Sequence, residues 1–145
     1  MKIVLDTNVL VSGFLNPYGA PGEIVRLVAS RAVSVCYDAR IICEYEDVLV
    51  RPKFQFDSDR IRSLMDQIEG DGEVYSTEPL TADLPDMDDA PFLEVAISGE
   101  ACLVTGNTRH YPKALRKGVC VMTPDEFRDF FRQSKQEEES KGEEE

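Results

Sequence analysis

The chain has 145 residues, of which 42% are hydrophobic and 30% are charged, so it is large enough for one domain with a real core and too small for two ordinary ones. The composition excludes a wholly disordered protein, and no apolar segment approaches the ~18 residues that a membrane crossing needs. The formal net charge of −12 counts against a broad basic surface for nucleic acid, because affinity for phosphates comes mainly from Lys and Arg.

The cysteines and the N-terminus bear on metal binding and location. The four cysteines form no CxxC pair and His110 is the only histidine, so the sequence lacks the ligand spacing of a zinc site. Asp6 and Asn8 interrupt the apolar N-terminal run, and no small-residue cleavage site follows it, so it does not match a secretory signal. We therefore expect a cytoplasmic protein with buried free thiols.

The first part of the chain alternates strands with a helix. Residues 2–5, KIVL, are a short apolar run without alternation, which predicts a central strand buried on both faces of a parallel sheet. Asp6 then falls at the carboxyl end of this strand. After a loop rich in Pro and Gly, the pattern predicts a helix over residues 23–31 and a strand over residues 32–37.

Two more helices and a short strand are predicted next. Apolar residues at helical spacing predict helices over residues 40–50 and 58–69. Glu44 lies one helical turn from both Ile41 and Val48, so it falls at the edge of the apolar face that this helix is predicted to bury. A short strand at residues 74–75 follows.

The remaining part of the chain continues the alternation. A loop over residues 76–87 leads into a predicted helix over residues 88–98, and strands are predicted over residues 101–105 and 119–122. The sequence TPDE at residues 123–126 is a capping box, with a hydroxyl cap, a proline at the first helical position and a glutamate at the third. It predicts a last helix, which buries phenylalanines.

Strands that alternate with helices this regularly predict an α/β domain with an open parallel sheet covered on both faces. Ligands of such sheets bind outside the carboxyl ends of the strands, and Asp6 and Asn107 each follow a strand, so we expect both at one edge. We assign residues 1–134 to this domain. Residues 135–145, KQEEESKGEEE, hold six Glu and two Lys, so they contribute −4 of the net charge and are predicted to be an acidic, disordered tail.

Acidic residues in three segments could bind a divalent cation. Asp6, Glu44 and the acids of residues 86–89, DMDD, supply the oxygen ligands that Mg²⁺ prefers, and a pair of ions roughly 3.5–4 Å apart can clamp the oxygens of a phosphodiester displacement. Each acid has a plainer explanation. Asp6 could stabilise a turn, Glu44 could be solvated, and one acid of residues 86–89 could cap the following helix.

Three segments together carry a more specific signal. They are MKIVLDTNVLVSGF, EYEDVLVRPKF and DMDDAPFLEVAISGEACLVTGNTRHYP. In this order and spacing they resemble the PIN-domain family, in particular its bacterial branch of toxin components from toxin–antitoxin pairs, from Met1 to about Phe131. The resemblance implies a three-layer α/β/α sandwich with a central parallel sheet. It also implies Mg²⁺- or Mn²⁺-dependent endonucleolytic cleavage of RNA, which leaves 5′-phosphate and 3′-hydroxyl ends.

The resemblance also assigns roles by position. The first family Asp corresponds to Asp6 and the helical Glu to Glu44, while the third acid corresponds to Asp89, with Asp88 the next candidate and Asp86 after it. Asp6, Glu44, Asp89 and Asp88 are therefore our expected catalytic residues and metal ligands. The partners that the family implies are RNA, an antitoxin protein and a second copy of the chain in a homodimer.

Asn107 departs from the family pattern. Many PIN domains carry an Asp after the Thr-Gly of the fourth strand, whereas this chain has Asn107 there. An amide can still orient a water, so we include Asn107 among the catalytic residues. It removes one negative charge, however, and ligand charge helps to set the affinity for divalent ions. The sequence therefore predicts weak metal binding, or binding of only one ion without substrate.

The expected substrate-binding residues flank these acids in the sequence. They are Asn8, Ser12, Thr105, Arg109 and His110. Asn8 and Ser12 shape the turn around Asp6, and Arg109 and His110 follow Asn107 directly, where a phosphate could be held. Tyr111 could stack on a base or could pack in the core, and the other basic clusters are typical of a mixed charged surface.

Two other functions fit parts of the sequence. A phosphotransferase with an aspartyl intermediate at Asp6 usually has a DxDxT-like loop, but the third position here is Asn8. A PIN-like scaffold that binds RNA or protein without cutting is favoured by Asn107 and by the negative charge. Metal-dependent cleavage of RNA by the pure protein would separate these alternatives from a ribonuclease.

Overall fold

A computed structural model describes residues 1–144, and five parallel strands form its central sheet. The strands are β1 (Lys2–Leu5), β2 (Ser34–Tyr37), β3 (Glu73–Val74), β4 (Cys102–Val104) and β5 (Val121–Met122). Their order in the sheet is β3-β2-β1-β4-β5, and all four neighbouring pairs are parallel. β1 lies at the centre, with Ile3, Val4 and Leu5 fully buried. The predicted parallel sheet is confirmed.

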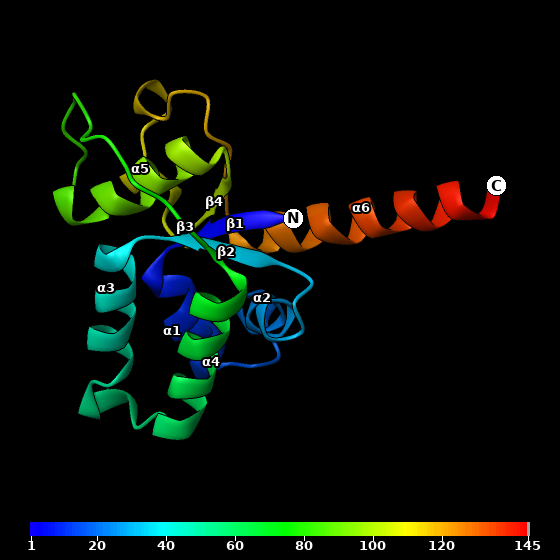
Figure 1. Ribbon diagram of the computed structural model, residues 1–145, viewed down its shortest axis with the longest axis horizontal. Helices are drawn as coiled ribbons and strands as arrows, with labels where there is room; N and C mark the ends of the chain where they lie inside the picture. Colours follow the sequence, from blue (N-terminus) through cyan, green and yellow to red (C-terminus); the bar gives the residue numbers. More distant parts are fainter. Residues whose placement is uncertain (145) are drawn as a thin grey trace.

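Helices cover both faces of the sheet, as predicted (Figure 1). They are α1 (Thr7–Leu15), α2 (Ala20–Ala29), α3 (Ala39–Leu49), α4 (Ser58–Asp71), α5 (Ala90–Gly99) and α6 (Pro124–Glu144), with short 3₁₀ helices at Pro52–Phe54, Met87–Asp89, Thr108–His110 and Lys113–Leu115. α5 packs on β1, β2 and β4, and Figure 1 shows α1 to α4 on the opposite side of the sheet. The fold is a three-layer α/β/α sandwich.

Helix α1 was not predicted from the sequence, which suggested a turn after Asp6. Its residues, TNVLVSGFL, include β-branched residues and a glycine, which have low helix propensity. The helix forms because packing outweighs propensity: Leu10 and Phe14 are buried, and α1 packs closely on α2. A Cβ atom at Gly13 would lie 2.7 Å from Val25 Cγ2, so glycine permits this close approach.

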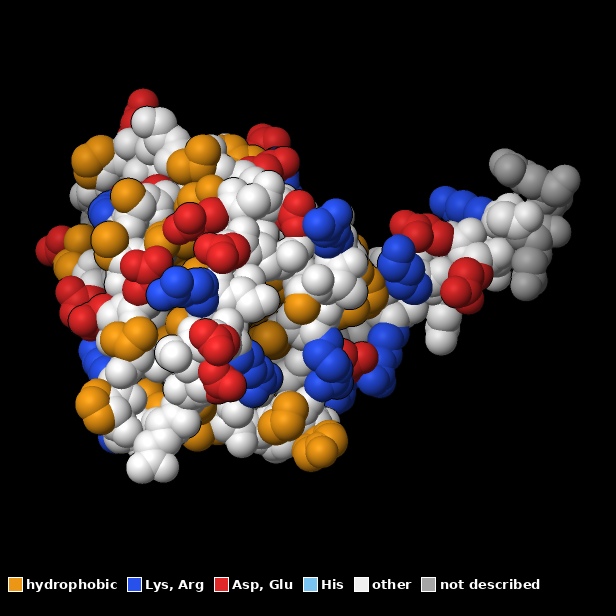
Figure 2. Space-filling model, turned by 60° about the horizontal axis from the view of Figure 1, so that its bottom comes forward, with side chains coloured by type: hydrophobic (Ala, Val, Ile, Leu, Met, Phe, Trp, Pro, Cys, Tyr) orange, Lys and Arg blue, Asp and Glu red, His pale blue; other side chains and the backbone are white. Residues whose placement is uncertain are grey.

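Helix α6 differs from the sequence-based expectation at its end. The predicted capping box is present: Thr123 N–H donates to Glu126 Oε1 at 3.1 Å, and Glu126 N–H donates to Thr123 Oγ1 at 3.2 Å. The helix continues through residues 135–144, where we expected disorder, because Glu, Gln and Lys propagate a helix that is already anchored. It projects from the body as an arm (Figure 1), along which Figure 2 shows charged side chains.

The strand order creates a topological switch point. The chain moves from β1 outward through β2 to β3 and then crosses to β4 on the other side of β1. Crevices at the carboxyl ends of two such strands are the usual ligand sites of open α/β sheets. The carboxyl ends of β1 and β4 meet directly, since Leu5 pairs with Val104. Among residues 1–144, no helix combines the length and the apolar character that a membrane crossing requires.

Candidate functional site

An open cleft of about 430 Å³ lies at the carboxyl ends of the central strands. Acidic side chains from three separate segments of the chain line it, together with neighbouring polar and apolar residues. The lining consists of Asp6, Thr7, Asn8, Val11, Ser12, Glu44, Val48, Arg51, Asp86, Asp88 and Asp89. The fold therefore brings five carboxylates to one cleft, although they come from the β1–α1 junction, from α3 and from the segment before α5.

Asp6 occupies the centre of this edge and is held firmly. It follows β1 directly, its N–H donates to Val104 O at 2.9 Å, and its side chain is only 6% exposed. The hydroxyls of Thr105 and Tyr111 both donate to Asp6 Oδ2, at 2.9 and 3.0 Å. Because both donors meet the same oxygen, the carboxylate is fixed in orientation and its other oxygen is left to face a ligand.

Glu44 is positioned by the residue next to it and by α1. The neighbouring Tyr45 is fully buried, and its hydroxyl donates to Leu5 O at 2.5 Å, which ties α3 to the end of β1. Glu44 itself is half-buried and accepts a hydrogen bond from Thr7 Oγ1. Burial raises the pKa of Glu44, the Thr7 hydrogen bond opposes this, and the charges of Asp6 and Asp88 raise it further. These acids are therefore close enough to repel one another.

The acids before α5 have different surroundings. Asp86 Oδ1 accepts from Asp88 N–H at 3.0 Å, so Asp86 caps the short helix at Met87–Asp89, and Asp88 is exposed in the cleft. Asp89 Oδ2 is buried and, among the described residues, receives no well-directed hydrogen bond, although His110 Nδ1 lies 2.9 Å away. Burial and the charge of Asp6 raise the pKa of Asp89 to about 6, and His110 opposes the shift.

The remaining predicted site residues lie in or around the cleft in different ways. Asn8 and Ser12 line it, and Asn8 Oδ1 also accepts from Gly106 N–H at 3.1 Å. Thr105 is buried beneath Asp6. Asn107 and His110 are half-buried beside the cleft, with Asn107 Nδ2 2.8 Å from His110 Nε2. Arg109 is exposed and does not line the cleft.

Three residues take part that the sequence did not assign to the site. Tyr111 is fully buried and hydrogen-bonds Asp6, so it packs in the core and does not stack on a base in this structure. Tyr45 anchors α3, as described above. Arg51 lines the cleft as its cationic side chain. Arg51 follows the end of α3 at Leu49, and its place just beyond the helix that carries Glu44 was the available signal in the sequence.

The donor set suits a hard divalent cation. All the carboxylate ligands supply oxygen, which Mg²⁺ and Mn²⁺ prefer. The buried Asp89 Oδ2 has His110 Nδ1 2.9 Å away but, among the described residues, receives no well-directed hydrogen bond. Within residues 1–144, no three His, Cys, Asp or Glu side chains already converge closely enough to hold an ion. Ion binding would therefore require these side chains to draw together, and it would relieve the mutual repulsion that raises their pKa values.

Comparison with known proteins identifies the family. The family described as PIN domain matches residues 2–109, which is well over half of the chain, and the protein belongs to the PIN domain family. This membership indicates a nuclease-type function. A protein of Methanocaldococcus jannaschii named as uncharacterized is 26% identical over 142 residues, which cover 90% of this chain and 92% of the relative. Neither comparison supports a bacterial branch or a toxin role in particular.

Proposed function

We propose that the protein is a metal-dependent endoribonuclease that hydrolyses RNA phosphodiester bonds. The observation that carries this proposal is the meeting of Asp6, Glu44, Asp88 and Asp89 in one open cleft at the β1/β4 switch point. The cleft is shallow and open to solvent, which suits a polymer chain that passes along a surface. Membership of the PIN family supports the same class of chemistry.

Asp6, Glu44 and Asp89 are the proposed ligands of Mg²⁺ or Mn²⁺, with Asp88 as an additional ligand. When bound, such an ion supplies positive charge that lowers the pKa of water and offsets charge on phosphate oxygens. Thr105 and Tyr111 hold the Asp6 carboxylate in one orientation, which is the preorganisation that such a site needs.

Other side chains of the cleft have proposed roles toward the substrate. Arg51 supplies the positive charge that holds a substrate phosphate. Asn8, Ser12, Arg109 and His110 are proposed to contact the RNA along the cleft and its margin, while Thr105 acts through Asp6. Asn107 is proposed to orient the attacking water, which displaces the leaving oxygen in line.

The decisive test uses the purified full-length protein and a 5′-labelled RNA. We expect cleavage with Mn²⁺ or Mg²⁺ and none with a chelator, and we expect Asp6→Asn to reduce the rate by roughly a hundredfold or more while the circular dichroism spectrum stays unchanged. Asp66→Asn is the matched control, because Asp66 is an exposed acid of α4 outside the cleft lining. Undiminished cleavage by Asp6→Asn would refute the assignment of the site.

A wider biological role follows from the same proposal. We propose that the ribonuclease acts in the cytoplasm, as the toxin of a type II toxin–antitoxin pair, in association with an antitoxin protein and as a homodimer. Coexpression with the product of a neighbouring gene tests this: the partner should copurify with the nuclease and suppress its cleavage of RNA. Cleavage that is unaffected by any such product would leave a ribonuclease without a toxin role.

The second candidate function is a PIN-like scaffold that binds RNA or protein without cutting. Asn107 favours it, because the site has one carboxylate fewer than many PIN domains. The same assay separates the two functions. Retention of the labelled RNA by the protein on a gel, with no metal-dependent product, would favour the scaffold.

A further inference from the structure

Two cysteines lie side by side, Cys102 at the start of strand β4 and Cys120 immediately before the neighbouring strand β5. Leu103 pairs with Val121 in the register of these strands, and Leu103 N–H donates to Cys120 O at 2.8 Å. Cys102 and Cys120 each precede one of these paired residues, so they lie next to each other on the two segments. Neighbouring strands lie about 4.8 Å apart, which is within the separation of about 4.4–6.8 Å between Cα atoms that a disulfide spans.

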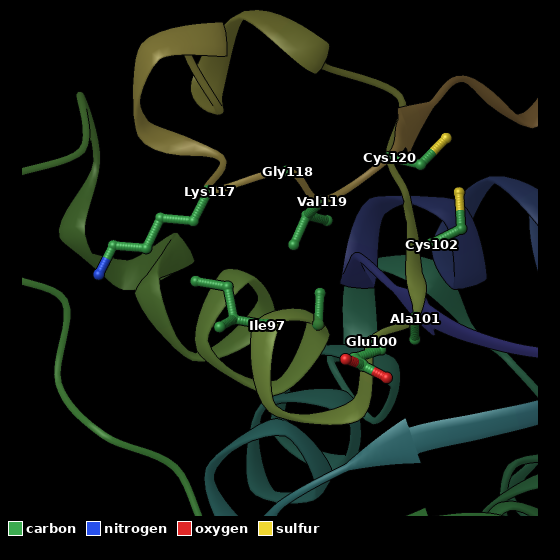
Figure 3. A pocket seen from close by; sticks show the side chains of 9 residues that line it. Ile97, Glu100, Ala101, Cys102, Lys117, Gly118, Val119 and Cys120 are labelled. Carbon is green, nitrogen blue, oxygen red and sulfur yellow. The ribbon is translucent and has the colours of Figure 1, made fainter.

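The two thiols also project to the same side of the sheet. Figure 3 shows the sulfur atoms of Cys102 and Cys120 on the same side of the two adjacent segments. The expectation that the thiols are buried is wrong for Cys120, which is exposed to solvent, whereas Cys102 is partly buried. Burial and the nearby Cys120 sulfur raise the pKa of Cys102. The pair thus combines one accessible sulfur with one sheltered sulfur directly behind it.

A cavity of about 420 Å³ adjoins the pair. The end of α5 and the segment before β5 form its walls, with Lys117 and Glu100 among the lining side chains (Figure 3). Cys120 is exposed, so a small thiol reagent can reach it from solvent. Cys36 is buried in β2 and Cys43 is exposed on α3, so neither shares this arrangement.

We propose that Cys102 and Cys120 form a redox-modification site, at which a low-molecular-weight disulfide such as glutathione disulfide converts the two thiols into a disulfide bond between β4 and β5. This site is separate from the acidic cleft and does not depend on the proposed nuclease function. The product joins two strands that already lie in register. It closes the loop between them, which carries Tyr111 and His110.

The reaction balances without any further reagent. The Cys120 thiolate attacks one sulfur of glutathione disulfide, forms a mixed disulfide and releases one glutathione thiolate. The Cys102 sulfur then attacks the Cys120 sulfur and displaces the second glutathione. The two protons that the protein thiols lose pass through water to the two glutathione thiolates. Two protein thiols are oxidised, and one glutathione disulfide is reduced to two glutathione molecules.

Tryptic peptide mapping can identify the bond directly, because each cysteine falls in its own peptide. Cys102 lies in residues 63–109 and Cys120 in residues 118–128, whereas Cys36 and Cys43 lie in residues 32–40 and 41–53. The full-length protein is reduced, freed of reductant and incubated with glutathione disulfide. We expect the intact mass to fall by ~2 Da through loss of two hydrogens and the peptides 63–109 and 118–128 to be linked until dithiothreitol is added.

Matched variants decide between this bond and other oxidation products. Cys43→Ser removes the other exposed thiol and should oxidise as the wild type does, whereas Cys120→Ser should abolish the linked peptides. The oxidised wild type should melt roughly 5 °C or more above the reduced form, because closing a loop of this length constrains the unfolded chain. A persistent glutathione adduct without linked peptides, or a bond that involves Cys36 or Cys43, would overturn the proposal.

Discussion

The hydroxyl of Tyr111 donates a 3.0 Å hydrogen bond to Oδ2 of Asp6, although 105 positions separate them in the chain. Tyr111 is fully buried, so this bond links the loop after β4 to the acid at the end of β1. Together with the Thr105 hydroxyl, which meets the same oxygen, it fixes the Asp6 carboxylate before any ligand arrives. This contact leads to the first prediction.

Tyr111→Phe removes that donor and keeps the aromatic ring. We expect the variant to unfold more easily by about 1–2 kcal/mol, because a buried hydrogen bond to a charged acceptor is lost while the packing is retained. Urea denaturation measures the change. Tyr18→Phe is the control, since Tyr18 is 93% exposed and should leave stability unchanged. Equal stability of Tyr111→Phe and wild type would show that the bond contributes nothing to the fold.

A second prediction concerns Asp89 and pH in the absence of metal. The pKa of Asp89 is raised to about 6, mainly by burial, so the folded protein keeps this proton where the unfolded chain has lost it. The stability that this group contributes is therefore fully present below about pH 4, near the ordinary pKa of aspartic acid, and is lost as the pH rises through about 6.

Asp89→Asn should remove this loss. With a chelator at pH 7, we expect the variant to be more stable than wild type by about 1–2 kcal/mol, after allowance for partial solvent screening, and we expect little difference at pH 4. Urea titrations at both pH values measure this. Asp66→Asn, at an exposed acid of α4, serves as the control. If wild type and Asp89→Asn had the same free energy of unfolding at pH 7, the buried Asp89 carboxylate would not destabilise the protein, and the prediction would be wrong.

A third prediction restores the acid that many PIN domains carry. Asn107→Asp adds a carboxylate beside His110 and the acidic cleft, so we expect Mn²⁺ to bind roughly tenfold more tightly. Calorimetric titration of both proteins with Mn²⁺ measures this directly, without reference to catalysis. Asn16→Asp serves as the control, since Asn16 follows α1 and is outside the cleft lining. Unchanged Mn²⁺ affinity would mean that residue 107 lies outside the reach of the ion.

A fourth prediction tests the cation of the cleft. Arg51→Ala should weaken binding of RNA several-fold. It should also reduce the slope of log affinity against log salt concentration by about one, because one phosphate contact is lost. Arg62→Ala is the matched control, because Arg62 is an exposed arginine of α4 outside the cleft lining. Fluorescence anisotropy at two salt concentrations, with the cleavage-deficient Asp6→Asn background, provides the measurement. Equal losses from both variants would indicate nonspecific attraction to the whole surface.

The fifth prediction concerns the arm formed by the end of α6. The division into a domain of residues 1–134 and a separate tail remains a prediction, although residues 135–144 are helical in the structure. Deletion of residues 135–145 should change the melting temperature by less than about 2 °C, because exposed polar residues contribute little to stability. A control deletion that extends into Phe131, which is buried, should destabilise the protein clearly.

Much of the fold could be predicted because its signals are local. The apolar run KIVL, the helical spacing around Glu44 and the capping box at residues 123–126 each depend on neighbours in sequence, and the structure contains β1, α3 and the start of α6 at these places. Helix α1 could not be predicted, since its weak helix formers are held by contacts with α2 that only the folded chain creates.

The site shows the same division between local and distant information. The identity and order of the acids could be read from the sequence, and their oxygen chemistry suggested a divalent ion. The sequence suggested that one acid of residues 86–89 caps a helix, but it could not show that this acid is Asp86. It also could not show that Tyr111 bonds to Asp6, or that Asp89 Oδ2 is buried without a well-directed donor among the described residues. These facts depend on which loops meet at the switch point, and spacing along the chain does not encode that.

The single direction of all five strands has a practical consequence for handling the molecule. Met1 precedes β1 at the amino edge of the sheet, and the arm of α6 leaves on the same side (Figure 1), while the acidic cleft opens at the opposite edge. A fluorescent protein, purification handle or surface tether attached beside Met1 or at the end of the arm would therefore leave the cleft accessible. Single-molecule or immobilised formats need no redesigned loop.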